Sequence, residues 1–279
     1  MAEYKDNGNI SGLDMKPTIQ WYEANKYQLL QHLPKPLNEP IPYEIENPEN
    51  IRLSEDDLSG LISLFPRNAR ERSILRKIVG KPETWFSKDS TQQQPLSTTS
   101  IEDSLSSTAI IPAYTDTSYW QSTGDPKCDV WLYKISDAAC SSDVSKIILS
   151  ESFIHEAGHA LINPAYDPLR EQTLKLPDGR VVNGFDYVFE FATMAENHNP
   201  ISHYASVYRG KNNKFESDDP TYDPRIPVSE ELSETIAAFL LGFAFGNDEQ
   251  RSMDPFADRP EIKKFVEDFL NAELVSKSQ

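Results

Sequence analysis

The chain has 279 residues, of which 38% are hydrophobic, and this length suits one large domain or one domain with an appendage. Its formal net charge is −17 and its pI lies near 4.7, so its surface repels phosphate backbones and we expect no nucleic-acid partner. Mean hydropathy is −0.56 and no run of about eighteen or more apolar residues occurs, which argues against a membrane-spanning helix or a membrane partner.

The N-terminal segment is polar and then rich in proline. Its first ten residues, MAEYKDNGNI, lack the basic and then apolar layout of a secretory signal. We therefore expect a cytoplasmic protein, or one that is secreted by a non-classical route. Further on, HLPKPLNEPIPYEIENPEN contains five prolines, each of which fixes φ and removes a backbone donor. We expect residues 1–50 to form an extended arm and residues 51–279 to form the main domain.

Two helices are predicted after this arm. The stretch SEDDLSGLISLF (54–65) places Ser54 at the N-cap, acidic residues in the first turn and apolar residues at helical spacing. The stretch ARERSILRKIVG (69–80) predicts a second, basic helix that ends at Gly80. Residues 87–108 are polar and rich in Ser and Thr, which predicts a surface loop.

The middle of the chain predicts a strand, a long helix and a hairpin. DVWLYKIS (129–136) alternates apolar and polar residues, which is typical of a strand. DVSKIILSESFIHEAGHALI (143–162) predicts a helix that Asn163 and Pro164 end. PDGR (177–180) is a turn between two short segments that could pair as a hairpin.

The chain has two cysteines, Cys128 and Cys140. They could form a disulfide in an oxidising compartment. Because the N-terminus shows no secretory signal, two free thiols are the favoured interpretation.

The C-terminal part predicts one loop and two helices. Residues 209–227 are charged and rich in proline, which indicates a loop. SEELSETIAAFLLGFAFG (229–246) is a strongly apolar helix, apolar on opposite sides and therefore buried. RPEIKKFVEDFLNAEL (259–274) is an amphipathic helix with Pro260 in its first turn.

Two histidines lie four residues apart in the helix predicted for 143–162. Residues i and i+4 stand above one another on a helix, so His155 and His159 point the same way and could hold one ion. Glu156 lies about 100° round the helix, where it could reach a water molecule bound to that ion. This is the physical content of the HExxH motif. Gly158 costs about 1 kcal/mol relative to Ala, which indicates that another element packs closely there.

A catalytic zinc site needs three protein ligands and one open position. The helix predicted for 229–246 carries Glu230 and Glu234, which lie on one stripe of a buried helix and need a charged partner. We predict that Glu230 is the third ligand and that Glu234 accepts a hydrogen bond from the free ring nitrogen of a ligand histidine. The alternatives are Glu231, which is the main rival, Glu234 itself, Asp167 and Asp186.

Four segments together resemble a family of metallopeptidases. HEAGH (155–159), PISHYAS (200–206), EELSETIAAFLLG (230–242) and RPEIKKFVEDFL (259–270) resemble the gluzincins, in particular the group that includes the anthrax lethal factor catalytic domain and the Pro-Pro endopeptidases. The resemblance covers roughly residues 143–272. It implies an α+β, zincin-like fold with a small mixed sheet, an active-site helix and a mainly helical C-terminal half.

The resemblance also implies roles for individual residues. The zinc ligands would be His155, His159 and Glu230, the general base would be Glu156, and a tyrosine would polarise the scissile carbonyl. That tyrosine would be Tyr204, although it precedes Glu230 by 26 residues rather than by about two helical turns. Tyr222, eight residues before Glu230, matches the spacing but not the local sequence.

We therefore expect a zinc-dependent metalloendopeptidase that acts on a protein or peptide, and a monomer by default. Glu156 would accept a proton from the attacking water, and Tyr204 or His203 would stabilise the oxyanion. The strand predicted for 129–136 would form the rim of the cleft and bind an extended peptide by strand addition. The alternatives are a catalytically idle gluzincin-like module that binds a partner, and a zinc hydrolase of a non-peptide amide.

Overall fold

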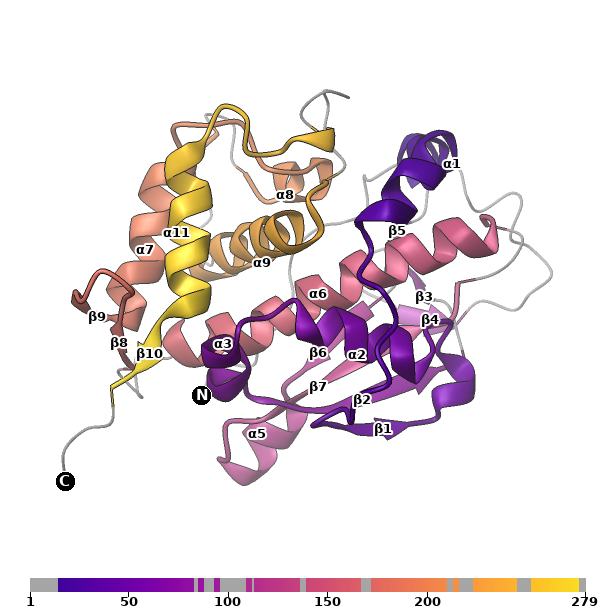
Figure 1. Cartoon of the computed structure of the whole chain (residues 1–279), viewed down its shortest axis with the longest axis horizontal. Helices are drawn as coiled ribbons and strands as arrows, with labels where there is room; N and C mark the ends of the chain where they lie inside the picture. Colours follow the sequence, from indigo (N-terminus) through magenta and orange to yellow (C-terminus); the bar gives the residue numbers. More distant parts are fainter. Residues whose placement is uncertain are drawn as a thin grey trace.

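The computed structural model describes the chain over residues 15–82, 85–87, 93–95, 109–111, 113–135, 139–166, 172–209, 213–215, 223–244 and 252–275. Within these ranges, a half that contains the main β-sheet lies beside a half made largely of helices (Figure 1). One long helix, α6 (Ser142–Tyr166), runs through both halves. This combination of a small mixed sheet with segregated helices confirms the predicted α+β class.

The main sheet has four strands, in the order β1 (Glu44–Glu46), β2 (Leu75–Lys81), β7 (Cys128–Tyr133) and β6 (Ala113–Asp116). The first three are parallel, whereas β6 pairs with β7 in the antiparallel direction. In the described part of the chain, β6 therefore forms one edge of the sheet. The strand predicted for residues 129–136 is confirmed as β7. Its predicted place at the rim is wrong, because β7 lies between two other strands and β6 takes the edge.

The other strands of the described residues form two smaller antiparallel sheets. One has the order β4 (Gln93–Pro95), β3 (Trp85–Ser87) and β5 (Ala109–Ile111), and the other has the order β10 (Glu273–Leu274), β8 (Thr173–Lys175) and β9 (Val181–Asn183). The loop predicted for residues 87–108 is thus wrong at β4, and most of the rest lies outside the described residues. The hairpin predicted around residues 177–180 is confirmed as β8–β9, with Gly179 at φ 89° in its turn.

Helix α6 packs against β6 and β7 and forms the centre of the hydrophobic core. Its apolar residues Ile147, Leu149, Phe153, Ile154 and Leu161 are all buried. The predicted end at Asn163 and Pro164 is wrong, because the helix continues to Tyr166. Pro164 has no N–H for the carbonyl of Ala160. That carbonyl instead accepts a hydrogen bond from the Ile74 N–H at 3.1 Å, so the last turn is tolerated.

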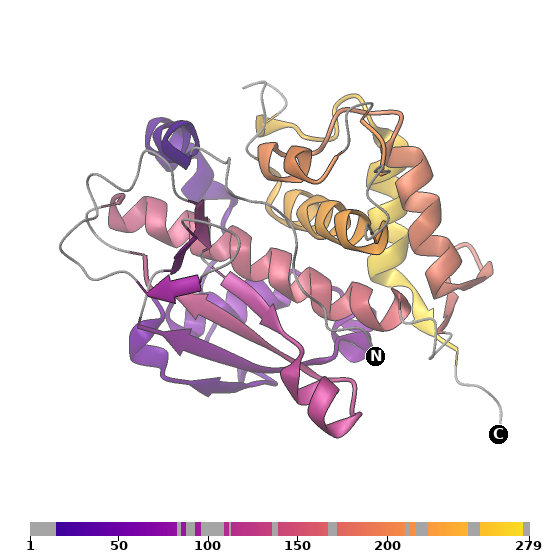
Figure 2. The ribbon, with the colours of Figure 1, turned by 180° about the vertical axis from the view of Figure 1, so that it is seen from behind.

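Four helices make up most of the C-terminal half: α7 (Gly184–Ala195), α8 (His203–Val207), α9 (Arg225–Leu241) and α11 (Pro260–Asn271). Helix α9 packs along α6 and also contacts α7, α8 and α11 (Figure 2). The helices predicted for 229–246 and 259–274 are present as α9 and α11. Helix α9 begins four residues earlier than expected and ends at Leu241, and the last two residues of the second prediction, Glu273–Leu274, form strand β10 instead. The five apolar residues on the predicted face of α11 are buried: Ile262, Phe265, Val266, Phe269 and Leu270.

The N-terminal segment contains a helix, α1 (Met15–His32), that lies against the N-terminal half of α6. The predicted extended conformation is therefore wrong for this part of residues 1–50. The helix accommodates Pro17 because this residue lies in the first turn, where a missing N–H costs no intrahelical hydrogen bond, and the next proline, Pro34, follows the end of the helix. Beyond α1 the proline-rich chain runs over α2 (Glu55–Ser63), where the Leu37 N–H donates to the carbonyl of Asp56 at 2.9 Å.

The helix predicted for residues 54–65 is confirmed as α2, which begins at a capping box formed by Ser54 and Asp57. The helix predicted for residues 69–80 is wrong. A short helix, α3 (Arg67–Arg72), is followed by β2, whose Ile78, Val79 and Gly80 are buried between β1 and β7. Partners distant in the sequence thus decide the conformation of this segment.

Cys128 and Cys140 are free thiols and both are buried, which confirms the favoured interpretation. Burial raises the pKa of the Cys128 thiol, and the neighbouring charge of Asp129 raises it further. Among the described residues, no helix is both long and apolar enough to cross a lipid bilayer.

Candidate metal centre

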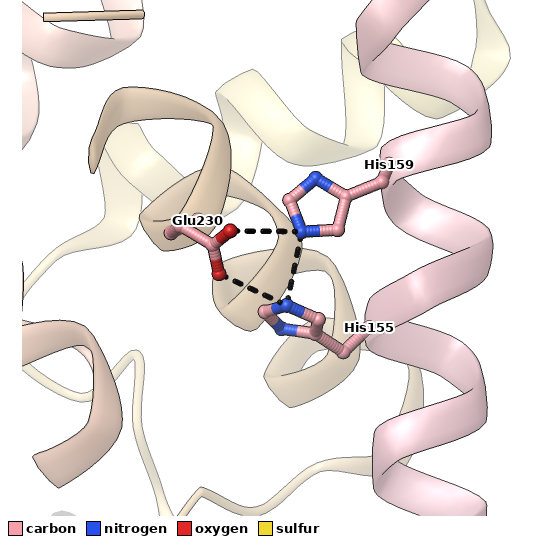
Figure 3. A group of neighbouring side chains, drawn as sticks. All are labelled: His155, His159 and Glu230. Atoms are coloured by element: carbon pink, nitrogen blue, oxygen red, sulfur yellow. Dashed lines mark hydrogen bonds and ion pairs between the residues drawn. The ribbon is translucent and has the colours of Figure 1, made fainter. Parts of the chain in front are cut away.

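The two histidines of α6 point toward α9 from successive turns of the helix (Figure 3). Both are buried, and their Nε2 atoms lie 3.1 Å apart. Their rings meet edge to face, with centroids 4.8 Å apart. The two imidazoles therefore point the same way, as their spacing of four residues predicted, and both Nε2 atoms face one place.

Glu230 in α9 completes the group from the opposite side. Its Oε2 lies 3.3 Å from Nε2 of His155, and its Oε1 lies 3.5 Å from Nε2 of His159 (Figure 3). One ligand atom from each of the three residues fits within 4.8 Å of the others. The structure thus brings together His155, His159 and Glu230 as a buried group that could hold a metal ion.

Charge pairing dominates the electrostatics of this group. Burial alone would raise the pKa of Glu230, but the nearby His159 and His155 outweigh burial and hold that pKa well below its usual value. Burial alone would lower the pKa of His155, but contacts with Glu230 and Glu234 raise it. The carboxylate of Glu230 against the two buried imidazoles makes a strongly polar point in an apolar core.

The second ring nitrogen of each histidine also has a polar neighbour. Oε1 of Glu234 lies 2.7 Å from Nδ1 of His155, although the contact is too bent for a good hydrogen bond. Oγ of Ser229 lies 2.9 Å from Nδ1 of His159. Such partners fix ring orientation and leave Nε2 for an ion. Glu234 was predicted to accept a hydrogen bond from a ligand histidine; it contacts Nδ1 of His155, but that hydrogen bond is not formed. Ser229 was not predicted as a partner, because a serine at the expected helix start is normally taken for an N-cap.

Gly158 allows α6 and α9 to approach closely enough for these contacts. A Cβ atom at this position would lie 3.3 Å from Cα and 3.4 Å from Oγ of Ser233. The close packing predicted from the glycine is therefore present. It brings the turn of α9 that carries Glu230 and Glu234 against the turn of α6 that carries the histidines.

Glu156 lies between the histidines in sequence but faces the edge strand β6. The hydroxyl of Thr115 in β6 donates a hydrogen bond of 2.6 Å to Oε2 of Glu156 and also lies 3.1 Å from its backbone carbonyl. This contact ties the carboxylate to the strand at the sheet edge. No local pattern indicates this role of Thr115, because its partner is 41 residues away in the chain.

Tyr204 in α8 also reaches the group. Its ring packs edge-on against His155 with centroids 5.7 Å apart, and its hydroxyl lies 3.5 Å from Oε2 of Glu230. The hydroxyls of Tyr204 and Tyr208 lie 2.8 Å apart. Burial, Tyr208 and Glu230 all raise the pKa of Tyr204, so its hydroxyl keeps its proton. The rival, Tyr222, lies outside the described residues.

The other candidate ligands among the described residues, Glu231 and Asp186, lie away from the group of three. Glu231 points away from the histidines and forms a buried ion pair with Arg209, where both side chains are at most 3% exposed. Asp186 is exposed in the first turn of α7. Asp167 lies outside the described residues. Among the other histidines, His198 contacts Glu261, and neither His32 nor His203 belongs to the group.

Glu151 adds another carboxyl on the same side of α6 as His155. Burial and the charge of Glu234 raise the pKa of Glu151 to about 8. Its carboxyl accepts a hydrogen bond from the hydroxyl of Tyr22 in α1. Acidic side chains therefore continue outward from the group of three along this side of the helix.

Comparisons of the chain with protein-family models, with curated proteins and with solved structures find no match. The interpretation of the site consequently rests on the geometry and chemistry of its residues.

Proposed function

We propose that the protein is a zinc-dependent metalloendopeptidase with a zincin-like fold. The observation that carries the proposal is the spacing of the three side chains. Ligands of a tetrahedral zinc ion, with bonds of about 2.0–2.2 Å, lie about 3.3 Å from one another. The spacings here are 3.1 Å between the imidazoles and 3.3 and 3.5 Å to the carboxylate. Two histidines and one glutamate are also a ligand set typical of catalytic zinc.

The presence of Glu156 favours a catalytic role for the ion over a purely structural role. A zinc ion held by His155, His159 and Glu230 would act as a Lewis acid and make water acidic near neutral pH. Glu156, held by Thr115, accepts the proton of the attacking water and delivers it to the leaving amine. The Tyr204 hydroxyl, which keeps its proton, donates to the developing oxyanion.

The edge strand β6 supports a peptide as the substrate. One side of β6 pairs with β7, and no strand of the described residues pairs with its other side. An extended peptide could add to that side through backbone hydrogen bonds. Because Thr115 of β6 contacts Glu156, a peptide paired with this strand would pass close to the catalytic base. We therefore assign peptide binding to β6 rather than to the predicted strand at residues 129–136.

Digestion of a peptide library tests this proposal. The unmodified protein with zinc is expected to cleave library peptides, and Glu156→Gln is expected to bind zinc but to lose cleavage by about a hundredfold or more. The substitution keeps the size of the side chain and removes the base. Zinc binding without any cleavage by the unmodified protein would favour a binding module. Hydrolysis confined to non-peptide amides would indicate a different substrate class.

A further inference from the structure

Two tyrosine hydroxyls meet beside the candidate metal centre. Tyr204 and Tyr208 lie four residues apart, in α8 and at its C-cap, so their side chains leave the same face of one helical turn. Their hydroxyl oxygens lie 2.8 Å apart, and their ring centroids lie 5.3 Å apart. This contact links Tyr208 to the side chain that is proposed to donate to the oxyanion.

The surroundings decide which of the two hydroxyls is the donor. The hydroxyl of Tyr204 also lies 3.5 Å from Oε2 of Glu230. A carboxylate only accepts and a hydroxyl carries one hydrogen, so Tyr204 is the donor in that contact. Its oxygen then has lone pairs but no hydrogen left for Tyr208, and Tyr208 must donate to Tyr204. The hydrogen bonds thus run in one direction, from Tyr208 through Tyr204 toward the metal centre.

Helix α8 is held in place at both of its ends. At its start, Oγ of the buried Ser202 accepts from the N–H of Ala205 at 2.9 Å. After its end, the guanidinium of Arg209 donates to both carboxylate oxygens of Glu231 in α9 and to the carbonyl of Ala195 in α7. A helix of five residues is not stable alone, so these contacts fix the tyrosine pair relative to α9.

We propose that Tyr208 is a positioning residue for Tyr204, the proposed oxyanion donor. The inference rests on the proposed function and adds a residue to it. Packing on His155 holds the ring of Tyr204, but its hydroxyl hydrogen turns to whichever acceptor is available. The hydrogen bond from Tyr208 occupies a lone pair of the Tyr204 oxygen and leaves the hydrogen of Tyr204 for the oxyanion. Hydrogen bonds in series also polarise one another, which makes Tyr204 a stronger donor.

Kinetic constants of Tyr208→Phe test this role in the full chain. The substrate is a peptide that the unmodified protein cleaves, with zinc, in the library digestion. Because the oxyanion exists only after attack, kcat should fall about 3- to 10-fold with little change in KM, as expected for one lost neutral hydrogen bond. The matched control is Tyr187→Phe in α7, whose ring is 2% exposed and stacks on Phe265 with centroids 4.4 Å apart. This control should keep its kcat, and zinc affinity by chelator competition should be unchanged in both variants.

Binding of a phosphonate analogue of the same peptide gives a second readout that does not depend on turnover. Its tetrahedral anionic group takes the place of the oxyanion, so calorimetry should show about a 3- to 10-fold weaker Kd in Tyr208→Phe. In the Tyr204→Phe background, the further change Tyr208→Phe should cost nothing, because the hydroxyl through which Tyr208 acts is already absent. A merely structural role of Tyr208 would not produce this dependence.

Three results would overturn the inference. They are unchanged kcat and phosphonate affinity in Tyr208→Phe, a loss confined to KM, and an equal loss of phosphonate affinity whether or not Tyr204 keeps its hydroxyl. An unmodified protein that cleaves no library peptide would overturn the proposed function and this inference with it. The two failures are therefore distinguishable, because only the second appears in the unmodified protein.

Discussion

Thr115 has a specific role at the scale of single residues. Its hydroxyl lies 2.6 Å from Oε2 of Glu156, the proposed base. A hydrogen bond to a charged group contributes about 1.5–3 kcal/mol, so Thr115→Val should lower kcat by about tenfold or more. Thr115→Ser keeps the hydroxyl and should retain most of the activity. Equal rates for the valine variant and the unmodified protein would show that this contact does not serve catalysis.

His155 makes zinc affinity depend on pH. In the metal-free protein Glu230 and Glu234 raise the pKa of His155 above its usual value of about 6.5, although burial alone would lower it. A ligand histidine must be neutral, so zinc displaces a proton. Affinity should therefore rise about tenfold per pH unit above pH 6.5, until the pH passes that raised pKa.

Competition with a chelator between pH 6.5 and 8.5, corrected for protonation of the chelator, measures this slope. Glu234→Gln removes one of the carboxylate charges that raise the pKa of His155. The rise should therefore level off at a lower pH in that variant. A flat affinity above pH 6.5 in the unmodified protein would contradict the prediction.

The individual site residues differed in how far the sequence could predict them. His155 and His159 share one helix, so their spacing alone predicts their convergence. Glu230 could be predicted as a ligand because a carboxylate buried in an apolar helix is costly unless it has a charged partner. Ser229 and Thr115 could not be predicted, because their roles depend on the distance between α9 or β6 and α6, which no local pattern contains.

Asp57 links two elements, since it belongs to the capping box of α2 and also reaches α6. Its Oδ1 lies 2.7 Å from Nζ of Lys146, and its Oδ2 accepts from the backbone N–H of Ser54 at 3.1 Å. Burial alone would raise the pKa of Asp57, but these two partners outweigh burial and lower it. A lowered pKa in the folded state means that the ionised carboxylate stabilises the fold above the usual pKa of about 3.9. That stabilisation is lost as the pH falls through the folded-state value.

Asp57→Asn should consequently lower the free energy of unfolding by about 1 kcal/mol at pH 7, the usual contribution of a helix cap. The difference should shrink as the pH falls below about 3.9 and through the lowered pKa of Asp57, because the carboxylate then becomes protonated in the unmodified protein as well. Urea unfolding at pH 7 and at a series of lower pH values measures it, with the exposed neighbour Asp56→Asn as the control. A deficit that does not shrink across the series would be inconsistent with the ionised carboxylate as its cause.

Local patterns predicted some elements correctly and failed for others. Helices α2 and α11 carry their own caps or amphipathic stripes, so a short stretch contains the whole signal. Strand β2 was predicted as a helix because its basic and apolar residues fit a helical period. Its conformation is set instead by pairing with β1 and β7, whose sequences lie elsewhere in the chain.

The proposed ion would join the two halves of the protein. Helix α6 packs on the main sheet, and Glu230 belongs to α9 in the helical half. A ligand at about a thousand times its dissociation constant stabilises a fold by about 4 kcal/mol. For a chain of this size, zinc should raise Tm by roughly 5–10 °C, and a chelator should reverse the rise. His159→Ala should show no zinc-dependent change in Tm. The same rise in that variant would place the stabilising ion elsewhere.

The proposed function requires that α6 and α9 together bind one zinc ion through His155, His159 and Glu230. Crystals grown with zinc and measured on both sides of the zinc absorption edge locate the ion directly. One anomalous peak is expected, about 2.0–2.2 Å from Nε2 of both histidines and from a carboxylate oxygen of Glu230. An empty site in zinc-containing crystals, or an ion held without Glu230, would contradict it.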